Sequence, residues 1–278
     1  MKIARYRIGD GLPTWGVLDL DSGTLTSIAE PIEAFAPRIT DEGGAPQVDG
    51  PPIDLERVTL LAPVTPTTKV VGAGANYLVH LERLGHTERP KTTIAYLKPL
   101  TAIVGPDEEI AYPPTTNELD FEVELVAVVG SSRLTGVTQG SRHVLGYTVG
   151  NDVSARDAAS AVGGIDLFSM KALDRSTPVG PWITTVDELP DIGSPGVEIS
   201  LRVNGEERQR DSTSNMIFSI DELFEYVTSR VTLCAGDLLF TGTTAGVGKE
   251  DGRFLKPGDE IESEVAGVGV LRNRVGSR

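Results

Sequence analysis

The chain contains a single cysteine, Cys234, among its 278 residues. One thiol cannot form an intrachain disulfide or a cysteine-based zinc site, so the composition favours an intracellular protein. The N-terminus lacks the apolar segment of a signal peptide, and no stretch approaches about 18 consecutive apolar residues, the length that spans a membrane. We therefore expect a soluble, cytoplasmic protein.

Positive charge is also scarce, because the sequence has 25 lysines and arginines but 40 aspartates and glutamates, which gives a formal net charge of -15. No long run of basic residues occurs, which argues against nucleic acid and anionic membranes as partners. An acidic surface also repels anionic small molecules. A site for an acidic substrate would therefore need local positive charge from a metal, a lysine or an arginine.

Several common catalytic and nucleotide-binding motifs are missing. The chain has no Gly-x-Ser-x-Gly elbow and no His-Glu-x-x-His, which excludes the commonest serine-hydrolase and zinc-protease classes. The loop at 72–77 is similar to a dinucleotide fingerprint, but Tyr77 stands at its third glycine position. The loop at 242–249 is similar to a phosphate loop, but its glycine spacing is wrong and Glu250 replaces the required Ser or Thr. We reject both as nucleotide sites.

The pattern along the chain divides it into two parts. Short segments of alternating apolar and polar residues fill 3–28, as in strands joined by turns. Residues 42–66 are rich in Gly and Pro, as in a connector. We therefore expect a small N-terminal β domain with its connector at 1–65 and a larger domain at 66–278.

The larger part is expected to be mainly β with some α. Strands joined more often by turns than by helices argue against a parallel doubly wound sheet. Helical spacing is clearest at 220–227, after the cap candidate Ser219, and a shorter helix is expected at 77–84. The expected strands cover 69–72, 101–104, 121–129, 143–149, 197–203, 237–241, 260–265 and 269–273.

Two acids interrupt one of these strands. Side chains alternate along a strand, so Glu122 and Glu124 would share one face, with their Cα atoms roughly 6 to 7 Å apart, while Phe121, Val123 and Leu125 point the other way. Acids at this spacing are common on solvated faces, and the spacing alone leaves that alternative open. The apolar run that follows argues for burial, where two like charges are costly and a divalent cation would compensate them.

Three further segments carry polar residues among apolar or glycine-rich neighbours. Asp152 ends an expected strand and Arg156 follows four residues on, although a turn with an Asx cap is the alternative. Lys171 lies among apolar neighbours, where it is either partly desolvated or a solvated loop lysine. His80 follows Asn76 at the start of the short helix, where a surface histidine is the more frequent outcome.

Taken together, these segments resemble the fumarylacetoacetate hydrolase family over roughly residues 66 to 273, in particular its acylpyruvase-like or 2-hydroxyhepta-2,4-diene-1,7-dioate isomerase-like branch. So many ordered matches argue against chance. The matching strings are Asn76-Tyr77-x-x-His80, Phe121-Glu122-Val123-Glu124-Leu125, Gly150-Asn151-Asp152-Val153-Ser154-Ala155-Arg156-Asp157, Lys171, Pro178-Val179-Gly180-Pro181, Asn204-Gly205-Glu206, Met216-Ile217-Phe218 and Thr241-Gly242-Thr243-Thr244-Ala245-Gly246-Val247-Gly248.

The resemblance implies a catalytic domain with a β-roll or β-sandwich fold, and a homodimer. It implies that Glu122, Glu124 and Asp152 bind Mg²⁺ or Mn²⁺, or Ca²⁺ in a crystal. Three carboxylates agree with this, because hard cations prefer oxygen donors.

The resemblance also implies an enzyme that acts on a keto acid, of the fumarylpyruvate or acetylpyruvate type formed in aromatic catabolism. A hydrolase of this kind breaks a C–C bond and leaves a pyruvate enolate, which the metal and Lys171 would stabilise. Tyr77, Arg156 and Thr243 are the expected substrate contacts.

Water activation would fall to His80, whose partner in the hydrolases of the family is a glutamate three residues later. Here that position is Arg83, and the catalytic candidate Glu82 lies only two residues after His80, off the shared helix face. Either a local kink in the helix brings Glu82 to His80, or the catalytic base is assembled with a different partner for His80. Decarboxylation, or isomerisation or tautomerisation, of keto diacids of the oxaloacetate or 2-hydroxymuconate type is the alternative, because none of these reactions needs activated water. A catalytically silent binding protein is a more remote one.

Overall fold

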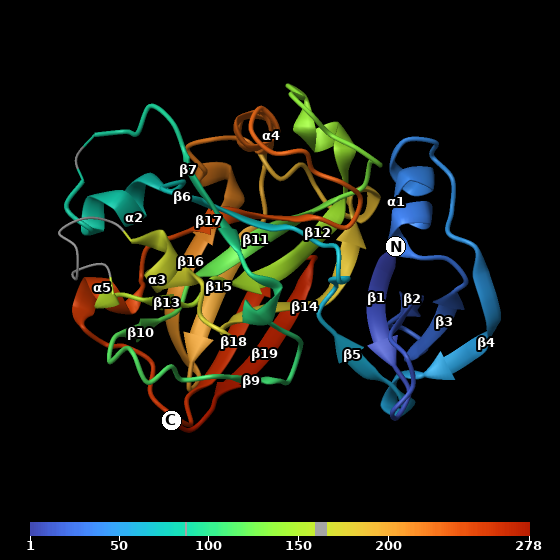
Figure 1. The fold of residues 1–278 in the computed structure, drawn as a ribbon, viewed down its shortest axis with the longest axis horizontal. Coiled ribbons are helices and arrows are strands. Elements are labelled where there is room, and N and C mark those ends of the chain that lie inside the picture. Colours follow the sequence, from blue (N-terminus) through green and yellow to red (C-terminus); the bar gives the residue numbers. More distant parts are fainter. Residues whose placement is uncertain (87, 159–165) are drawn as a thin grey trace.

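The protein consists mainly of β-strands, which form two large sheets with short helices around them (Figure 1). The structure, a computed structural model, describes residues 1–86, 88–158 and 166–278. The expected mainly β fold with some α is confirmed. None of the helices in these ranges has the length and apolar character needed to cross a membrane.

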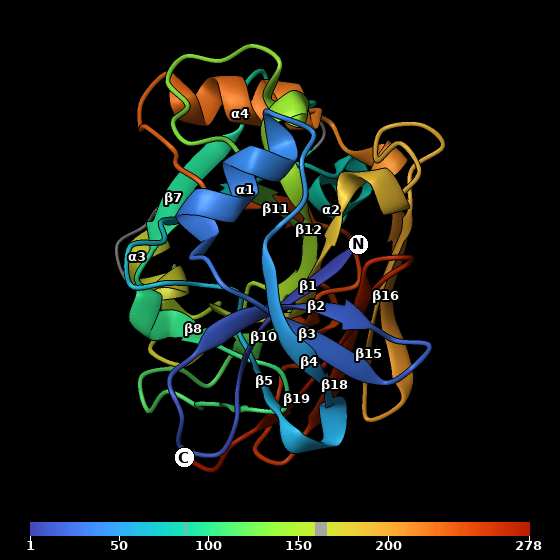
Figure 2. The same cartoon turned by 90° about the vertical axis from the view of Figure 1, so that its right-hand side faces the viewer.

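The larger sheet joins the N-terminal strands to the rest of the chain. From one edge to the other it contains β4 (Val48–Asp54), β3 (Thr24–Ile28), β2 (Thr14–Asp19), β1 (Lys2–Arg7), β14 (Thr177–Thr185), β12 (Val144–Asn151), β11 (Val123–Val129), β17 (Leu238–Thr243), β6 (Val70–Gly74) and β7 (Ile94–Lys98). Two short strands flank this path: β5 (Thr59–Leu61) pairs with β1, and β8 (Ile103–Val104) pairs with β14. Strands β1 to β4 lie together at one end of the molecule in Figure 1, and Figure 2 shows them side by side from that end.

The smaller sheet has five strands and packs against the middle of the larger one. In order they are β16 (Glu206–Ser212), β15 (Glu198–Val203), β18 (Glu260–Val265), β19 (Gly269–Val275) and β9 (Glu109–Ile110), and a separate pair is formed by β10 (Leu119–Asp120) and β13 (Ser154–Ala155). Strands β12 and β14 lie against β18 and β19. The core between the sheets includes Leu125 and Val149 from one sheet and Leu201, Val265 and Leu271 from the other.

The helices are short and lie at the edges of the sheets. They are α1 (Ile32–Thr40), α2 (Leu78–Arg83), α3 (Leu167–Lys171), α4 (Ile220–Thr228) and α5 (Gly248–Asp251). The helix expected at 220–227 is α4, and it begins with a capping box in which Ser219 and Glu222 bond each other's backbone N–H groups. Helices α2, α3 and α5 gather at the end of the molecule opposite β1 to β4 (Figure 1).

Strand β11 runs through the centre of the fold, and all seven of its residues are buried. Val123 and Leu125 belong to the core between the sheets, whereas Val126 belongs to a second core cluster. The predicted alternation is therefore present, and it places Glu124 on the face away from Val123 and Leu125. The strand begins at Val123, two residues later than expected.

Several strands were not predicted, for identifiable physical reasons. Strand β14 contains Pro178 and Pro181, and β16 has a mostly charged sequence. β16 is an edge strand whose pairing with β15, and not its own apolar pattern, defines it. The stretch at 42–66 that we interpreted as a connector contains β4, β5 and the 3₁₀ turn η1 (Leu55–Arg57). Helix α1 was also missed, and it carries Pro37 in its interior.

Candidate active site

The carboxylates of Glu122, Glu124 and Asp152 converge at one point. Strands β11 and β12 pair with Val123 opposite Asn151, and the Asp152 N–H donates to the Glu122 carbonyl at 2.8 Å. One oxygen of each acid lies within 4.8 Å of the other two, and all three residues are buried. The structure thus brings together the three residues that the sequence suggested as metal ligands.

Two of these acids are neutralised by buried cations. The Lys171 ammonium lies 2.5 Å from Glu122 Oε2 and 2.6 Å from Asp152 Oδ2. Arg156 donates to the other oxygen of Glu122, and Lys98 donates to the other oxygen of Asp152. Burial alone would raise the pKa of both carboxyls, but the cations outweigh it, so the pKa of Glu122 and that of Asp152 lie below their ordinary values. Both acids are therefore ionised at neutral pH.

Glu124 has no ion-pair partner among the described residues. Its Oε2 accepts a hydrogen bond from the Gly242 N–H at 2.7 Å. Burial, followed by the charges of Asp152 and Glu122, raises the pKa of Glu124 well above its ordinary value. Ionising Glu124 therefore requires more positive charge. A divalent cation fits this cluster, because three carboxylates supply the hard oxygen donors that Mg²⁺ and Mn²⁺ prefer.

Two residues of β7 support the cluster and were not predicted. Tyr96 donates its hydroxyl to Asp152 Oδ2, and fully buried Lys98 forms the contact to Oδ1. The Tyr96 ring packs over Gly72, where an added Cβ would lie 2.4 Å from the ring. Tyr96 and Lys98 have the same two-residue spacing as Glu122 and Glu124, which is the signal that could have revealed them.

The carboxylate beside His80 is Glu250 and not Glu82. His80 Nδ1 lies 3.3 Å from Glu250 Oε1, and both side chains are largely buried. Glu82 is exposed on α2, and no hydrogen bond joins it to His80 in the described part of the chain. Of the two arrangements left open by the sequence, the structure has the one with a different partner, supplied by α5.

Glu250 is held in place by three further contacts. The Gly246 N–H donates to both of its oxygens at 3.0 Å, and Arg83 Nη1 lies 3.2 Å from Oε2. Burial would raise the pKa of Glu250, but the hydrogen bonds from His80, Gly246 and Arg83 outweigh it and hold that pKa below its ordinary value. An ionised carboxylate therefore faces His80 at neutral pH. Arg83, which stands where the family hydrolases carry a glutamate, contacts this same carboxylate.

Asn76 anchors the segment that leads into α2. Its amide donates to the carbonyls of Thr241, at 2.7 Å, and Phe218, at 3.2 Å, and its Oδ1 accepts from the Phe218 N–H at 2.6 Å. The side chain is buried, so these hydrogen bonds take the place of the ones that it would form with water. Asn76 thereby fixes α2, and with it His80, to the end of β17.

We expect Asn76→Ala to lower the free energy of unfolding by about 1–3 kcal/mol for each buried group that loses its partner. Urea unfolding of the purified variant measures this change. Asn215→Ala serves as the matched control, since Asn215 is exposed and a surface substitution usually changes stability by less than about 0.5 kcal/mol. Equal stability of the two variants would contradict the anchoring role.

Glu122 and Glu124 of the acid cluster line one cavity together with His80, and its volume is about 380 Å³. Arg156 and Lys171 also line it, and both are already in ion pairs. Arg156 Nε donates to Asp120 Oδ2 at 2.8 Å, in addition to its contact with Glu122. Arg156 thus supports the acid cluster.

Thr243 and Tyr77, the other two residues expected to contact the substrate, are less available for such a contact. Thr243 lines the cavity, but its hydroxyl donates to the Val123 carbonyl at 2.8 Å and accepts from the Gln209 amide at 3.0 Å. Tyr77 is buried and is not among the residues that line the cavity. Its hydroxyl has no hydrogen-bond partner in the described ranges.

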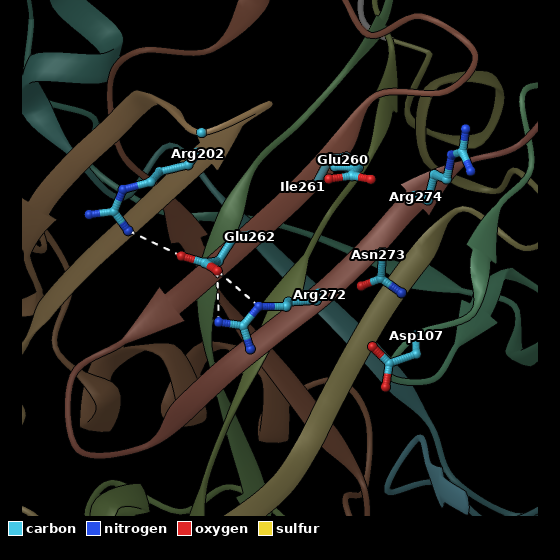
Figure 3. A pocket seen from close by; sticks show the side chains of 9 residues that line it. Asp107, Arg202, Glu260, Ile261, Glu262, Arg272, Asn273 and Arg274 are labelled. Carbon is cyan, nitrogen blue, oxygen red and sulfur yellow. Dashed lines mark hydrogen bonds and ion pairs between the residues drawn. The ribbon is translucent and has the colours of Figure 1, made fainter.

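A second cavity, of about 490 Å³, lies on the five-stranded sheet and shares no lining residue with the first (Figure 3). Arg202 and Arg272 both face Glu262, at 3.3 and 2.8 Å, so charges there are largely paired within the chain (Figure 3). We assign no chemistry to it.

Comparison with known proteins identifies the family. Residues 69–276 match the family described as "Fumarylacetoacetate (FAA) hydrolase C-terminal", and residues 1–63 match "Rv2993c-like, N-terminal". The protein belongs to the fumarylacetoacetate hydrolase family. The resemblance seen in the sequence is therefore confirmed. "Protein Rv2993c" of Mycobacterium tuberculosis is 36% identical over 99% of this chain and 98% of that one.

Other relatives of this family member carry names that specify a reaction. The "Oxaloacetate tautomerase FAHD2A, mitochondrial" of Bos taurus is 40% identical over 81% of this chain and 72% of its own length. The crystal structure of a 5-carboxymethyl-2-hydroxymuconate delta-isomerase from Mycobacterium smegmatis aligns over 100% of both chains, with a TM-score of 0.84 and 33% identity. Both named reactions are isomerisations.

Proposed function

We propose that the protein is a metal-dependent tautomerase that interconverts the enol and keto forms of a 2-oxo acid. The observation that carries this proposal is that His80, which Glu250 contacts from behind, lines the same cavity as Glu122 and Glu124 of the acid cluster. The names of the tautomerase and isomerase relatives support the same reaction type. Mg²⁺ or Mn²⁺ is the proposed cofactor.

A divalent cation at Glu122, Glu124 and Asp152 would supply the charge that holds the acid and polarises its keto group. Lys171 adds positive charge at the same place, since its ammonium lines the cavity. This local charge overcomes the repulsion of an acidic protein for an anionic substrate. Lys98 and Arg156 keep Asp152 and Glu122 ionised and oriented.

His80 is proposed to move the proton at C3 of the substrate. Its Nδ1 faces Glu250, which leaves the second ring nitrogen for the cavity. Glu250 orients the ring, so His80 can deliver a proton to C3 as the enol oxygen loses its own to solvent, and can remove the C3 proton in the reverse direction. Glu250 is a positioning residue in this reaction, because it acts through His80.

The His80–Glu250 pair also favours a second candidate, hydrolysis of the C–C bond of an acylpyruvate. A histidine oriented by a carboxylate can activate water as well as move a proton at carbon. The absence of a glutamate at position 83 therefore does not remove the means for water attack. The two candidates share the enolate and differ in whether water enters.

Product analysis separates the candidates. We would incubate the Mg²⁺-loaded protein with the enol form of oxaloacetate, with 2-hydroxymuconate, and with acetylpyruvate and fumarylpyruvate, and follow the products by absorbance and NMR. We expect enol-to-keto conversion well above the protein-free rate for at least one of these acids. If pyruvate is released from the acylpyruvates faster than any of the acids is tautomerised, the protein is a hydrolase and our proposal is wrong. If CO₂ is released from oxaloacetate, the protein is a decarboxylase and our proposal is equally wrong. The homodimer implied by the family remains a prediction that light scattering can test.

A further inference from the structure

We propose that the substrate carries an apolar group, and not a second carboxylate, at the end away from its keto-acid head. This inference rests on the proposed function, because it takes the head to lie at the acid cluster. It makes that function more specific, because the residues that line the rest of the same cavity indicate the class of substrate.

Part of the lining of the cavity is an apolar wall. It is formed by Leu81, Leu84, Pro90, Ile94, Leu167 and Met170. None of the six belongs to a hydrophobic core cluster of the protein. Leu84 and Leu167 are half-buried, and Ile94 is 40% exposed. Apolar side chains that surround a cavity without entering the core are typical of a binding site for an apolar group.

The positive charges that line the cavity are already paired. Lys171 lies between Glu122 and Asp152, and Arg156 contacts both Glu122 and Asp120. A second substrate carboxylate would have to draw one of these cations away from a buried acid. Leaving a buried charge without its partner is strongly unfavourable, so neither cation is available for that carboxylate.

The remaining ionisable residues on the outer part of the lining do not help a second carboxylate. They are His86 and Glu88, both exposed, and Glu88 carries the charge that repels an acid. The residues outside the described ranges, Thr87 and 159–165, include no Lys, Arg or His. Those segments therefore hold no further cation that could receive the acid.

The predicted class is a 2-oxo acid with one carboxylate and a branched alkyl or aryl tail, or an acylpyruvate with an apolar acyl group. This differs from a substrate such as oxaloacetate, which has a carboxylate at each end and which the tautomerase relative is named for. The apolar wall would exclude water from the tail, while a divalent cation at the acid cluster would bind the head.

Calorimetric titration of the Mg²⁺-loaded full-length protein tests the class without turnover. The two probes are 4-methyl-2-oxopentanoate and 2-oxoglutarate, which share the keto-acid head and differ in the tail. We expect the branched acid to bind at least about 10-fold more tightly, in the range that one misplaced group in an apolar pocket produces. Equal or tighter binding of 2-oxoglutarate would overturn the inference.

Substitutions of residues in the apolar wall test whether the preference for an apolar tail depends on this surface. Leu84→Lys should reverse the preference, by placing a cation beside the tail, and Leu84→Met, the matched control, should preserve it. Ile94→Lys repeats the test from β7 if Leu84→Lys does not fold, as judged from its Tm. A ratio of affinities that neither lysine variant changes would overturn the inference.

Failure of the inference and failure of the proposed function are distinguishable. Pyruvate, which is the head with no tail, is the third probe. If pyruvate binds and the tails show no preference for the apolar acid, the inference alone fails. If none of the three acids binds in the presence of Mg²⁺, the head assignment fails, and the proposed function and the inference fail together.

Discussion

Glu250→Gln is expected to lower the turnover number for enol-to-keto conversion by about 100-fold, with little change in KM. The substitution retains the shape of the side chain but removes the charge that orients His80. Because both residues are largely buried, water cannot replace the lost charge. Steady-state kinetics at saturating Mg²⁺ measure the effect.

The matched control for this variant is Glu82→Gln. Glu82 is exposed on the same helix as His80, so its substitution should leave the turnover number within about a factor of two. Melting temperatures of the two variants test whether either has lost its fold, since Glu250 also accepts from Gly246. An active Glu250→Gln protein with an inactive Glu82→Gln protein would contradict the assignment.

Glu124→Gln is expected to have two opposite effects on the protein. The affinity for Mg²⁺ or Mn²⁺ should fall by more than about 100-fold, since even the loss of an outer contact to a metal ligand costs roughly 10- to 100-fold. The metal-free variant should nevertheless be more stable than the metal-free wild type at pH 7. The glutamine side chain can still accept the hydrogen bond from the Gly242 N–H.

The direction of the stability change follows from the pKa of Glu124. Its pKa in the folded protein lies above the value in the unfolded chain, because burial and the acids Asp152 and Glu122 disfavour the ionised form. The folded state therefore loses stability as the pH rises from the unfolded pKa to the folded one, and that loss persists at pH 7. A neutral glutamine removes it.

Differential scanning calorimetry with and without Mg²⁺ tests both effects. A gain of a few degrees in the metal-free Tm is expected, at about 2–4 °C for each kcal/mol. Glu56→Gln is the control, because Glu56 is exposed and should change neither the Tm nor its shift with Mg²⁺. A Glu124→Gln protein that Mg²⁺ still stabilises as much as the wild type would contradict the metal site.

The metal cluster could be predicted because the spacing of Glu122 and Glu124 in an expected strand agrees with the family resemblance, which adds Asp152. Alternation places Glu122 and Glu124 on one side, and the apolar residues after them require burial. Asp152 follows the end of the next expected strand, and its N–H donates to the Glu122 carbonyl just beyond the paired residues Val123 and Asn151. The same reasoning, applied to Tyr96 and Lys98, would have found the residues that hold Asp152.

The partner of His80 could not be predicted from local patterns. Glu250 lies 170 residues away along the chain and reaches His80 only because α5 and α2 are folded together at one end of the molecule. Helix spacing indicated where a partner was missing but could not say which distant acid replaces it. Similarly, β16 is a strand because of its neighbour β15, and no period in its own charged sequence indicates this.

Central to the proposed function is the formation of an enolate from a 2-oxo acid in this cavity, with a divalent cation at the acid cluster. The most direct measurement is the exchange of the methyl protons of pyruvate for deuterium, followed by proton NMR in D₂O with Mg²⁺. We predict that the wild-type protein accelerates the exchange over the protein-free rate and that Glu124→Gln returns it to that rate. Exchange by the wild type no faster than in Mg²⁺ or Mn²⁺ buffer alone would contradict the claim.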